Sequence, residues 1–478
     1  MSLYQTLRQE HSQFFYKSAN WQITDDGLLL SWQFEVSPNF KFQPKMAIPL
    51  PTGFVLDETK KVIFDNLVFQ IGLVEMLSYW KATASPQIII EARWLNPDQI
   101  SWWHKLLIQG LGEYFYTNQI EFTDQNFVTI QTTQPKETHS KPTSIKPTKS
   151  NQNCYLIPLG GGKDSIVTLE LMRQYQSSNQ VPNRLLGLAI NPTSATKNIA
   201  QIANLPLIEV RRQLDPQLLH LNSLGYLNGH TPFSALVAMV SLLVAYIYNC
   251  SEIILSNEKS SNEGNTHYLG QSINHQYSKT FEFESDFRSY VQTYVQPLVP
   301  EKLPYYYSLL RPFYELQIGR MFAKLGQPYF SVFRSCNRGQ KTGVWCGECA
   351  KCLFAFSILF PFLGEDQTIS IFGQNLFQNH DLLQIALELI GQKATKPFDC
   401  VGTHMESVAA FYLSSQWYLK NNQPLPYVLL QLQPQLARHS DLPDQVQQIL
   451  SNWDENHFVS NDLSAFMKSR FINSPVGQ

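Results

Sequence analysis

The sequence predicts an α/β fold with a parallel sheet, which follows a small α+β domain and precedes a mostly helical C-terminal region. Short apolar runs at residues 154–159, 185–190, 207–210 and 252–255 alternate with helical patterns, as is typical of a parallel sheet. A glycine-rich loop follows the first of these runs, at the edge where ligands bind to open α/β sheets. Beyond residue 370 the pattern becomes helical and rich in glutamine.

A chain of 478 residues is long for one domain, and its composition divides it into four segments. The first, residues 1–131, combines expected strands at 28–36 and 87–91 with expected helices at 66–80 and 97–116, which predicts an α+β domain. Residues 132–152 are rich in Pro, Lys, Ser and Thr, so we expect a flexible linker. The last two are the α/β domain, residues 153–370, and a mostly helical region, residues 371–478.

The composition of the chain indicates which partners and which cellular compartment to expect. The formal charge of -2 gives no overall attraction for nucleic acid, so no nucleic-acid partner is expected. The first ten residues lack the apolar stretch of a signal peptide, and four of the seven cysteines are clustered, which favours a reducing cytoplasm over a disulfide framework. The apolar run 233–248 is shorter than the roughly 20 residues that cross a bilayer. We therefore expect a buried crossover helix and no membrane partner.

The glycine-rich loop is the most informative feature of the chain. Three glycines allow backbone N–H groups to approach a phosphate closely, and the helix that follows adds its positive N-terminus. The motif is neither a P-loop nor a dinucleotide fingerprint. It resembles the S-G-G-x-D-S pyrophosphate loop of enzymes that split ATP into AMP and pyrophosphate, with glycine in place of the first serine. The predicted ATP-binding residues are Gly160, Gly161, Gly162, Lys163, Asp164 and Ser165. A glycine turn in an ordinary α/β domain is the alternative.

A polar run follows the expected strand at 252–255. Its side chains, Asn257 and Glu258 among them, should face the same crevice as the glycine loop, because both follow strands of one parallel sheet. Mg²⁺ prefers one or two carboxylates together with phosphate oxygens. Glu258 or Asp164 is therefore expected to hold Mg²⁺ between phosphates, and Asp164 is expected to take part in catalysis. A solvated loop with capping residues is the alternative.

A cluster of cysteines provides the second chemical signal. Cys336, Cys346, Cys349 and Cys352, with glycines between them, can fold around one tetrahedral ion. Their spacing also resembles that of iron–sulfur ferredoxins, but there the fourth cysteine lies downstream and precedes a proline. We expect structural Zn²⁺; an iron–sulfur cluster and cysteines without metal remain the alternatives. The spacing is similar to that of the zinc knuckle of 7-cyano-7-deazaguanine synthases, which also carry the pyrophosphate loop.

A third site is expected near residues 396–407. Cys400 and His404 lie close together in the sequence, beside a turn marked by Pro397 and Gly402 and before a helical pattern. These two residues could present a thiol and an imidazole to one cavity. The alternative is a buried cysteine and a surface histidine.

Five motifs taken in order resemble one family, the ATP-dependent UDP-N-acetylmuramoyl-L-alanyl-L-glutamate epimerases. They are GGGKDS, SNEKSSNEGN, INHQYSK, CGECAKC and KPFDCVGT. The resemblance implies a cytoplasmic enzyme of peptidoglycan synthesis that converts the terminal L-Glu of a UDP-linked muramoyl dipeptide to D-Glu, with ATP consumed to AMP and pyrophosphate. It also implies that Cys400 belongs to the acid/base pair at the glutamate α-carbon and that His404 is its partner.

Two other functions stay open at this stage. One is a nucleobase- or tRNA-modifying enzyme that uses the same loop for adenylation, although the only lysine-rich stretch is the expected linker. The other is a non-catalytic adenine-nucleotide sensor.

Overall fold

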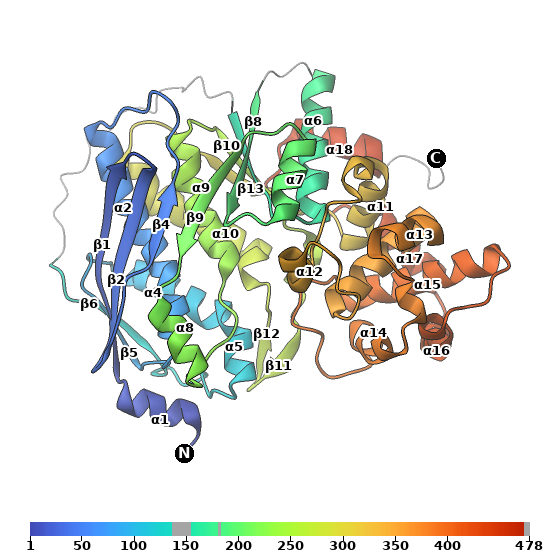
Figure 1. Cartoon of the computed structure of the whole chain (residues 1–478), viewed down its shortest axis with the longest axis horizontal. Coiled ribbons are helices and arrows are strands. Elements are labelled where there is room, and N and C mark those ends of the chain that lie inside the picture. The colour runs from blue at the N-terminus through green and yellow to red at the C-terminus, as the bar shows by residue number, and fades with distance from the viewer. Residues whose placement is uncertain (136–153, 180–182, 473–478) are drawn as a thin grey trace.

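The computed structural model describes residues 1–135, 154–179 and 183–472 (Figure 1). Its centre is a mixed sheet of 11 strands in the order β13–β10–β7–β8–β9–β4–β2–β1–β5–β6, with β3 paired to β2, and a separate hairpin joins β11 to β12. The strands are β1 (Gln13–Thr24), β2 (Gly27–Val36), β3 (Phe40–Phe42), β4 (Lys45–Ile48), β5 (Gln87–Ile90), β6 (Thr129–Thr132), β7 (Cys154–Pro158), β8 (Arg184–Ile190), β9 (Leu207–Gln213), β10 (Glu252–Leu255), β11 (Thr266–Tyr268), β12 (Gln271–Ile273) and β13 (Tyr305–Ser308).

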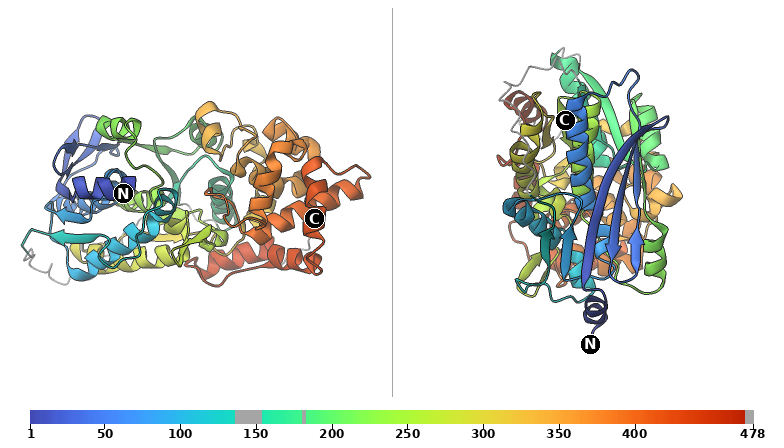
Figure 2. Two further views of the ribbon diagram at one scale, coloured as in Figure 1. Left: turned by 90° about the horizontal axis from the view of Figure 1, so that it is seen from below. Right: turned by 90° about the vertical axis from the view of Figure 1, so that its left-hand side faces the viewer.

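Helices cover both faces of the sheet and form the C-terminal region. They are α1 (Leu3–Glu10), α2 (Glu58–Glu75), α3 (Leu77–Trp80), α4 (Pro97–Gly110), α5 (Gly112–Thr117), α6 (Lys163–Asn179), α7 (Ser194–Ile202), α8 (Pro216–Ser223), α9 (Phe233–Ile247), α10 (Phe281–Tyr290), α11 (Glu315–Leu325), α12 (Asn337–Thr342), α13 (Ala350–Phe372), α14 (Leu383–Leu389), α15 (His404–Lys420), α16 (Tyr427–Leu436), α17 (Leu442–Ser451) and α18 (Asn461–Phe471). Figure 2 shows the chain running from the N-terminal strands at one end of the molecule to the C-terminal helices at the other.

The parallel sheet expected from the sequence is confirmed. The four expected strands are β7, β8, β9 and β10, and they lie side by side in parallel pairs in the order β10–β7–β8–β9. The sequence analysis missed a fifth parallel strand, β13, which pairs with β10. It is short and consists of three tyrosines and a serine. The predicted crossover helix is α9, which is buried along most of its length and leads to β10.

The N-terminal segment contains the expected strands β2 and β5 and also the long strand β1, which the sequence analysis missed. Its two expected helices have different bounds. The first begins at Glu58, because the Asp57 side chain accepts a hydrogen bond from the Lys60 backbone N–H at 2.8 Å. It is interrupted at Met76, and the second is interrupted at Leu111.

One sheet contains strands of both the first and the third predicted segments. Strand β4 pairs in antiparallel fashion with β2 on one side and with β9 on the other. The predicted domain boundaries therefore stay predictions, and the strands on either side of them form one continuous sheet. The predicted linker, residues 132–152, lies outside the described residues from position 136 onward.

Alternate residues of the central strands pack into two separate cores. In β7, Leu156 belongs to the core shared with the N-terminal helices, whereas Ile157 belongs to the core shared with α6, α11 and the C-terminal helices. In β10, Ile253 and Ile254 divide in the same way. Because successive side chains of a strand point to opposite faces, the sheet forms the middle layer between these two cores.

Two helical stretches are long and apolar enough to cross a membrane, Glu58–Trp80 and Ala350–Phe372. The most apolar window of the first is 83% buried inside the protein and that of the second 56%. Core helices of globular proteins meet the same criteria, so this is weak evidence for a membrane span.

The order of the strands determines where a ligand site can form. From β7 the chain proceeds through β8 and β9 on one side, whereas β10 lies on the other side of β7. The connections thus leave in opposite directions between β7 and β10. In open α/β sheets a crevice forms at the carboxyl ends of the strands at such a switch point.

Candidate functional site

A cavity of about 380 Å³ lies at the carboxyl ends of β7 and β10. Segments that are far apart in the sequence line it, and most of the predicted catalytic and ATP-binding residues are among the residues that they contribute. The polar lining includes Asp164, Ser165, Thr193, Thr196, Ser256, Asn257, Glu258, Lys279, Ser335, Asn337, Gln340, Lys351 and Cys400, together with the backbone of Gly160 and Gly162. The cavity therefore brings together the glycine loop and Cys400, although Asp164 and Cys400 are 236 residues apart in the sequence.

The glycine loop has a backbone shape that needs glycine at one position. Gly161 has φ +83°, and a Cβ there would lie 3.1 Å from Thr196 Oγ1. The loop is also held from outside: the Arg334 N–H donates to the Gly161 carbonyl at 2.8 Å, and Gln340 Nε2 donates to the Gly160 carbonyl at 3.0 Å. Because these two hydrogen bonds fix both carbonyls, residues 334–340 help to determine the shape of the loop.

The three residues after the glycines have different roles. Lys163 is buried and forms ion pairs with Asp164 and Glu315, so it stabilises the start of α6 and is not among the described residues that line the cavity. Burial alone would lower the pKa of Lys163, but the two carboxylates raise it above its ordinary value. Ser165 Oγ donates to the Gly162 carbonyl at 3.0 Å. Asp164 lines the cavity, with its side chain 30% exposed.

The polar segment after β10 faces the glycine loop across the cavity. Asn257 Nδ2 donates to Ser308 Oγ at 3.1 Å, which ties this segment to β13. The Glu258 side chain is buried and has no hydrogen-bond or ion-pair partner within the described part of the chain. Burial raises the pKa of Glu258, and the neighbouring charge of Asp164 raises it further. Two carboxylates that repel each other beside a phosphate loop fit a divalent cation, which would bring them together.

Cys400 is surrounded by cationic groups. Lys279 Nζ donates to Cys400 Sγ at 3.0 Å, and the charge of Lys351 also acts on the thiol. Burial would raise the pKa of Cys400, but Lys279, Lys351 and a hydrogen bond from His275 together lower it well below its ordinary value. These neighbours favour the thiolate form of Cys400, which lies at a half-buried position on the wall of the cavity.

The imidazole beside Cys400 belongs to His275, and a carboxylate holds it in turn. His275 Nδ1 hydrogen-bonds Glu113 Oε2, and the same ring interacts electrostatically with Cys400. Burial would lower the pKa of His275, but the bonds to Cys400 and Glu113 raise it to about 9. Glu113, His275 and Cys400 therefore form a chain of carboxylate, imidazolium and thiolate.

His404 lies elsewhere. It is the first residue of α15, and its Nδ1 is 2.9 Å from the Leu389 carbonyl oxygen, while its backbone N–H donates to Glu263. It is absent from the described residues that line the cavity. The structure thus brings Cys400 together with His275 and Glu113, which the sequence analysis did not assign to the site. His275 belongs to the INHQYSK motif, which was its only signal in the sequence, and Glu113 had none.

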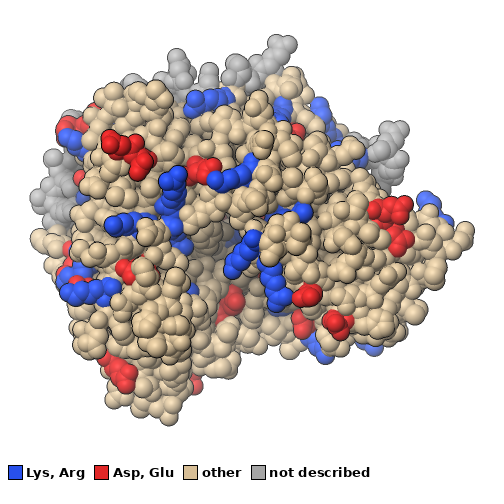
Figure 3. All heavy atoms as spheres, in the orientation of Figure 1, with Lys and Arg blue, Asp and Glu red and all other residues tan. Residues whose placement is uncertain are grey.

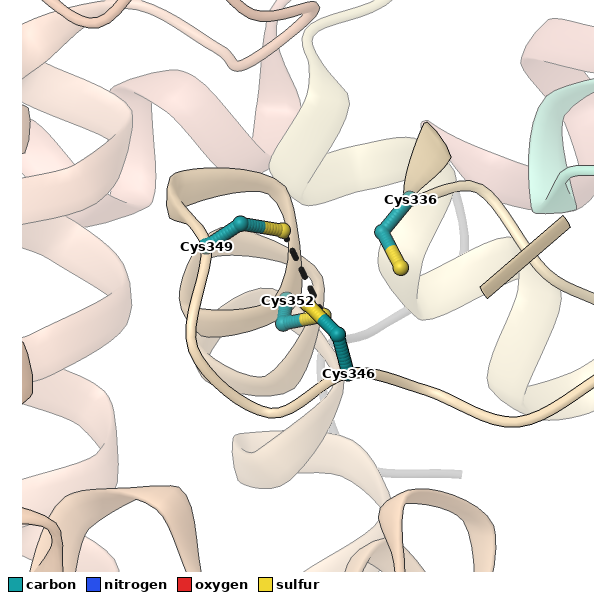
Figure 4. A group of neighbouring side chains, drawn as sticks. All are labelled: Cys336, Cys346, Cys349 and Cys352. Atoms are coloured by element: carbon teal, nitrogen blue, oxygen red, sulfur yellow. Dashed lines mark hydrogen bonds between the residues drawn. The ribbon is translucent and has the colours of Figure 1, made fainter. Parts of the chain in front are cut away.

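The four cysteines converge as their spacing predicts (Figure 4). Their sulfur atoms all lie within 4.8 Å of one another, with 3.5 Å between Cys352 and each of Cys346 and Cys349. Cys336 and Cys349 are the N-cap residues of α12 and α13, so both lie at helix ends that favour negative charge. Four sulfur donors at this separation fit one tetrahedral metal ion.

The cysteine cluster and the glycine loop are mechanically connected. Arg334 and Gln340, which donate to the loop carbonyls, lie on either side of Cys336 in the sequence. Ser335 packs closely against the loop, because a Cβ added to Gly162 would lie 3.3 Å from the Cβ of Ser335. On the other side of the cluster, Lys351 lies between Cys349 and Cys352 and reaches the cavity. A metal bound by the four cysteines would therefore fix both the loop and one cation of the site.

Lys and Arg side chains gather around the hollow in the middle of the face shown in Figure 3. The chain as a whole is nearly neutral, with a formal charge of -2, so this is a local feature. Asp and Glu side chains also lie beside the hollow, but Lys and Arg are more numerous there, and an excess of one charge sign attracts ligands of the opposite sign. The distribution suits an anionic ligand.

Comparison with known proteins identifies two matching domain families. The MurL N-terminal domain family matches residues 5–309, and the MurL C-terminal domain family matches residues 332–442. No solved structure matches the chain.

Three curated relatives carry the name UDP-N-acetyl-alpha-D-muramoyl-L-alanyl-L-glutamate epimerase. The protein from Micromonospora sp. is 30% identical over 404 residues, which are 83% of this chain and 85% of the relative. The protein from Salinispora tropica is 29% identical over 401 residues, 83% of each chain. The protein from Xanthomonas oryzae pv. oryzae is 30% identical over 373 residues, 77% of this chain and 78% of the relative.

The contact between Cys400 and His275 leads to a prediction about pH. In His275→Asn the hydrogen bond and positive charge of the imidazolium are lost, so the pKa of Cys400 should rise towards its ordinary value. The pH of half-maximal alkylation of Cys400 by iodoacetamide, followed by peptide mass spectrometry, should therefore move upward. His404→Asn should leave that pH where it is, because His404 bonds Leu389 instead. An unchanged titration in His275→Asn would contradict the assignment.

Proposed function

Because the chain belongs to the MurL family, we propose that it converts the terminal L-Glu of UDP-N-acetylmuramoyl-L-Ala-L-Glu to D-Glu, in the cytoplasmic synthesis of peptidoglycan precursors. The single observation that carries the proposal is the cavity that the glycine loop shares with Cys400 and its cationic neighbour Lys279. Activation of a carboxyl group and inversion at the adjacent α-carbon need both halves of such a cavity.

The chemistry explains why ATP would be consumed. The α-proton beside a carboxylate is hardly acidic, since its removal places a second negative charge next to the first. Adenylation of the carboxyl group removes the first charge and lets the carbonyl accept electron density as an enolate. The α-proton is then removed from one face and returned to the other, and hydrolysis releases AMP. The rim of Lys and Arg in Figure 3 suits a substrate that carries a diphosphate.

The proposal assigns ATP and Mg²⁺ to the sheet side of the cavity. The backbone of Gly160, Gly161 and Gly162 and the start of α6 would receive the phosphates, as in a pyrophosphate-loop domain. Ser165 would add its hydroxyl when it turns from the Gly162 carbonyl. Asp164 and Glu258, with Asn257 beside them, would hold Mg²⁺, because they present two carboxylates to one space. Lys163, which does not line the cavity, would hold the Asp164 carboxylate in position through its ion pair with it.

Incubation with ATP, Mg²⁺ and the L-Glu dipeptide nucleotide tests the proposal. We expect equimolar AMP and pyrophosphate, and chiral analysis of the hydrolysed product should show D-Glu. Asp164→Asn keeps the shape of the side chain and an oxygen for Lys163 but removes the charge, so AMP formation should fall by about 100-fold or more.

Asp366→Asn, which neutralises an exposed carboxylate of α13, provides the matched control and should behave like the parent. Formation of AMP without any D-Glu would contradict the epimerase function, and full activity in Asp164→Asn would contradict the assigned nucleotide site.

The proposal places Cys400 after adenylation. Cys400→Ser leaves the glycine loop and both carboxylates in place, so the variant should still bind ATP and form the adenylate. A serine hydroxyl stays protonated at neutral pH, and epimerisation should fall by about 100-fold or more. Deuterium incorporation at the glutamate α-carbon in D₂O should fall with it. Normal α-exchange in a folded Cys400→Ser protein would show that the thiolate only stabilises the structure.

The proposal also assigns structural Zn²⁺ to the four cysteines, because a closed set of four thiolates is typical of zinc sites that stabilise a fold. Cys349→Ser should lower the zinc content and the Tm together, since metal binding is coupled to folding. For a domain of about 150–250 residues, the size range of the predicted domain 153–370, a loss of about 2 kcal/mol in the free energy of unfolding lowers Tm by roughly 4–8 °C. Cys400→Ser provides the matched control and should keep its metal. Iron with inorganic sulfide in elemental analysis would replace zinc.

A further inference from the structure

The three interacting side chains of Glu113, His275 and Cys400 have the arrangement of an activated nucleophile. The Cys400 sulfur interacts electrostatically with the His275 ring, and that ring is hydrogen-bonded to the half-buried carboxylate of Glu113. Enzymes that form acyl intermediates are recognised by this arrangement of nucleophile, histidine and orienting carboxylate, whatever their fold. Here it opens into the same cavity as the glycine loop.

We propose that Cys400 is the nucleophile that accepts the acyl group of the adenylated glutamate, and that epimerisation takes place on the resulting thioester. The proposal rests on the proposed function, because the adenylate is the acyl donor. It replaces the proton-transfer role that the sequence predicts for Cys400 with a covalent one.

The position of Cys400 supports this assignment. Cys400 and the glycine loop line one cavity of about 380 Å³, so an acyl group joined to a nucleotide phosphate in the loop lies within the same small space as the sulfur. An acyl phosphate reacts readily with a thiolate that contacts it. A thiolate close enough to take a proton from the α-carbon is also close to the adjacent carbonyl carbon.

The partners of Cys400 support a nucleophile over a base. Lys279, Lys351 and His275 all stabilise the negative charge on sulfur, which weakens the thiolate as a base. Removal of a proton from carbon depends strongly on base strength. The nucleophilicity of a thiolate falls by less than its basicity as the pKa falls, and in thiol–disulfide exchange the Brønsted coefficient is about 0.4–0.5. The same surroundings therefore reduce proton abstraction by Cys400 more than they reduce its attack on a carbonyl.

Lys279 has a second use in this scheme. Its Nζ lies 3.0 Å from the sulfur and its side chain lines the cavity, so it can donate to negative charge that develops on an oxygen bound to the attacked carbon. A donor fixed before the reaction stabilises such an oxyanion without reorganisation. The main chain of Lys279 is itself held, because its carbonyl accepts from the buried Arg311 at 2.5 Å.

The bonds balance as follows. A lone pair of Cys400 Sγ forms the C–S bond, the bond between the carbonyl carbon and the phosphate oxygen breaks, and AMP leaves with that electron pair. No proton moves in this step, because the sulfur is already ionised. After epimerisation, water forms a C–O bond and the C–S bond breaks, which regenerates the thiolate, and both protons of water pass to the solvent. No atom is oxidised or reduced.

A thioester would also serve the epimerisation. Sulfur donates little electron density to the carbonyl, so the α-proton of a thioester is far more acidic than that of a carboxylate. The covalent bond keeps the activated glutamate in place after AMP has left. Release of AMP and release of the product thus become separate events.

Rapid acid quenching followed by intact-protein mass spectrometry tests the proposal. With ATP, Mg²⁺ and the L-Glu dipeptide nucleotide, the parent should gain the mass of the substrate less one water, up to about one adduct per chain. Neutral hydroxylamine should remove the adduct, and peptide mapping should place it on Cys400. In a single turnover, AMP should appear before the free D-Glu product.

Three variants make the test specific. Cys400→Ala should form the adenylate but no adduct, and Asp164→Asn should form neither. Glu113→Gln should still form the adduct, with its pH of half-maximal formation moved, because the orienting carboxylate acts only through His275.

The outcomes separate the covalent step from the reaction as a whole. D-Glu formed by the parent with no adduct at any quench time, and with AMP and product released together, would overturn the thioester and leave the proposed function standing. An adduct mapped to another residue would also overturn it. Absence of both AMP and D-Glu in the parent would instead overturn the proposed function.

Discussion

The arrangement of the site depends on one buried ion pair, between Arg311 and Glu284. Both side chains are 1% exposed, and Arg311 Nη2 lies 2.9 Å from Glu284 Oε2. The same guanidinium donates to the backbone carbonyl of Glu258 at 2.6 Å and to that of Lys279 at 2.5 Å. One cation thus fixes the main chain of both residues, whose side chains face the cavity. Removal of one partner of a buried pair typically costs about 3–5 kcal/mol, because the other charge stays uncompensated.

This constraint explains how loops from several segments form one rigid site. The loop after β10 and the segment before α10 are joined through Arg311, and Glu284 also accepts from the Ser308 backbone N–H at the end of β13. On the other side, the segment that precedes the cysteine cluster holds the glycine loop through its carbonyls. Each loop is therefore tied to a strand end or to the cluster, as positioned catalytic groups require.

Local motifs could be predicted from the sequence, and long-range partners could not. The glycine loop and the four cysteines are each contained in one short segment, so their spacing reveals their chemistry. Cys400, His275 and Glu113 come from three distant segments, and only the fold brings them together. Proximity in sequence favoured His404 as the partner of Cys400, but α15 begins at that residue and its ring contacts the Leu389 carbonyl. Strand β1 escaped prediction because much of its burial pattern does not alternate.

The contribution of Glu113 gives the N-terminal segment a function that its own sequence does not suggest. Glu113 lies on α5, whose neighbours pack in the core on the N-terminal side of the sheet, yet its carboxylate orients His275. The cavity is therefore divided by charge. Asp164 and Glu258 form an acidic half that would suit a cation, whereas Lys279 and Lys351 form a basic half around Cys400. Glu113 acts on Cys400 only through His275, so the N-terminal segment supports the basic half from outside the cavity.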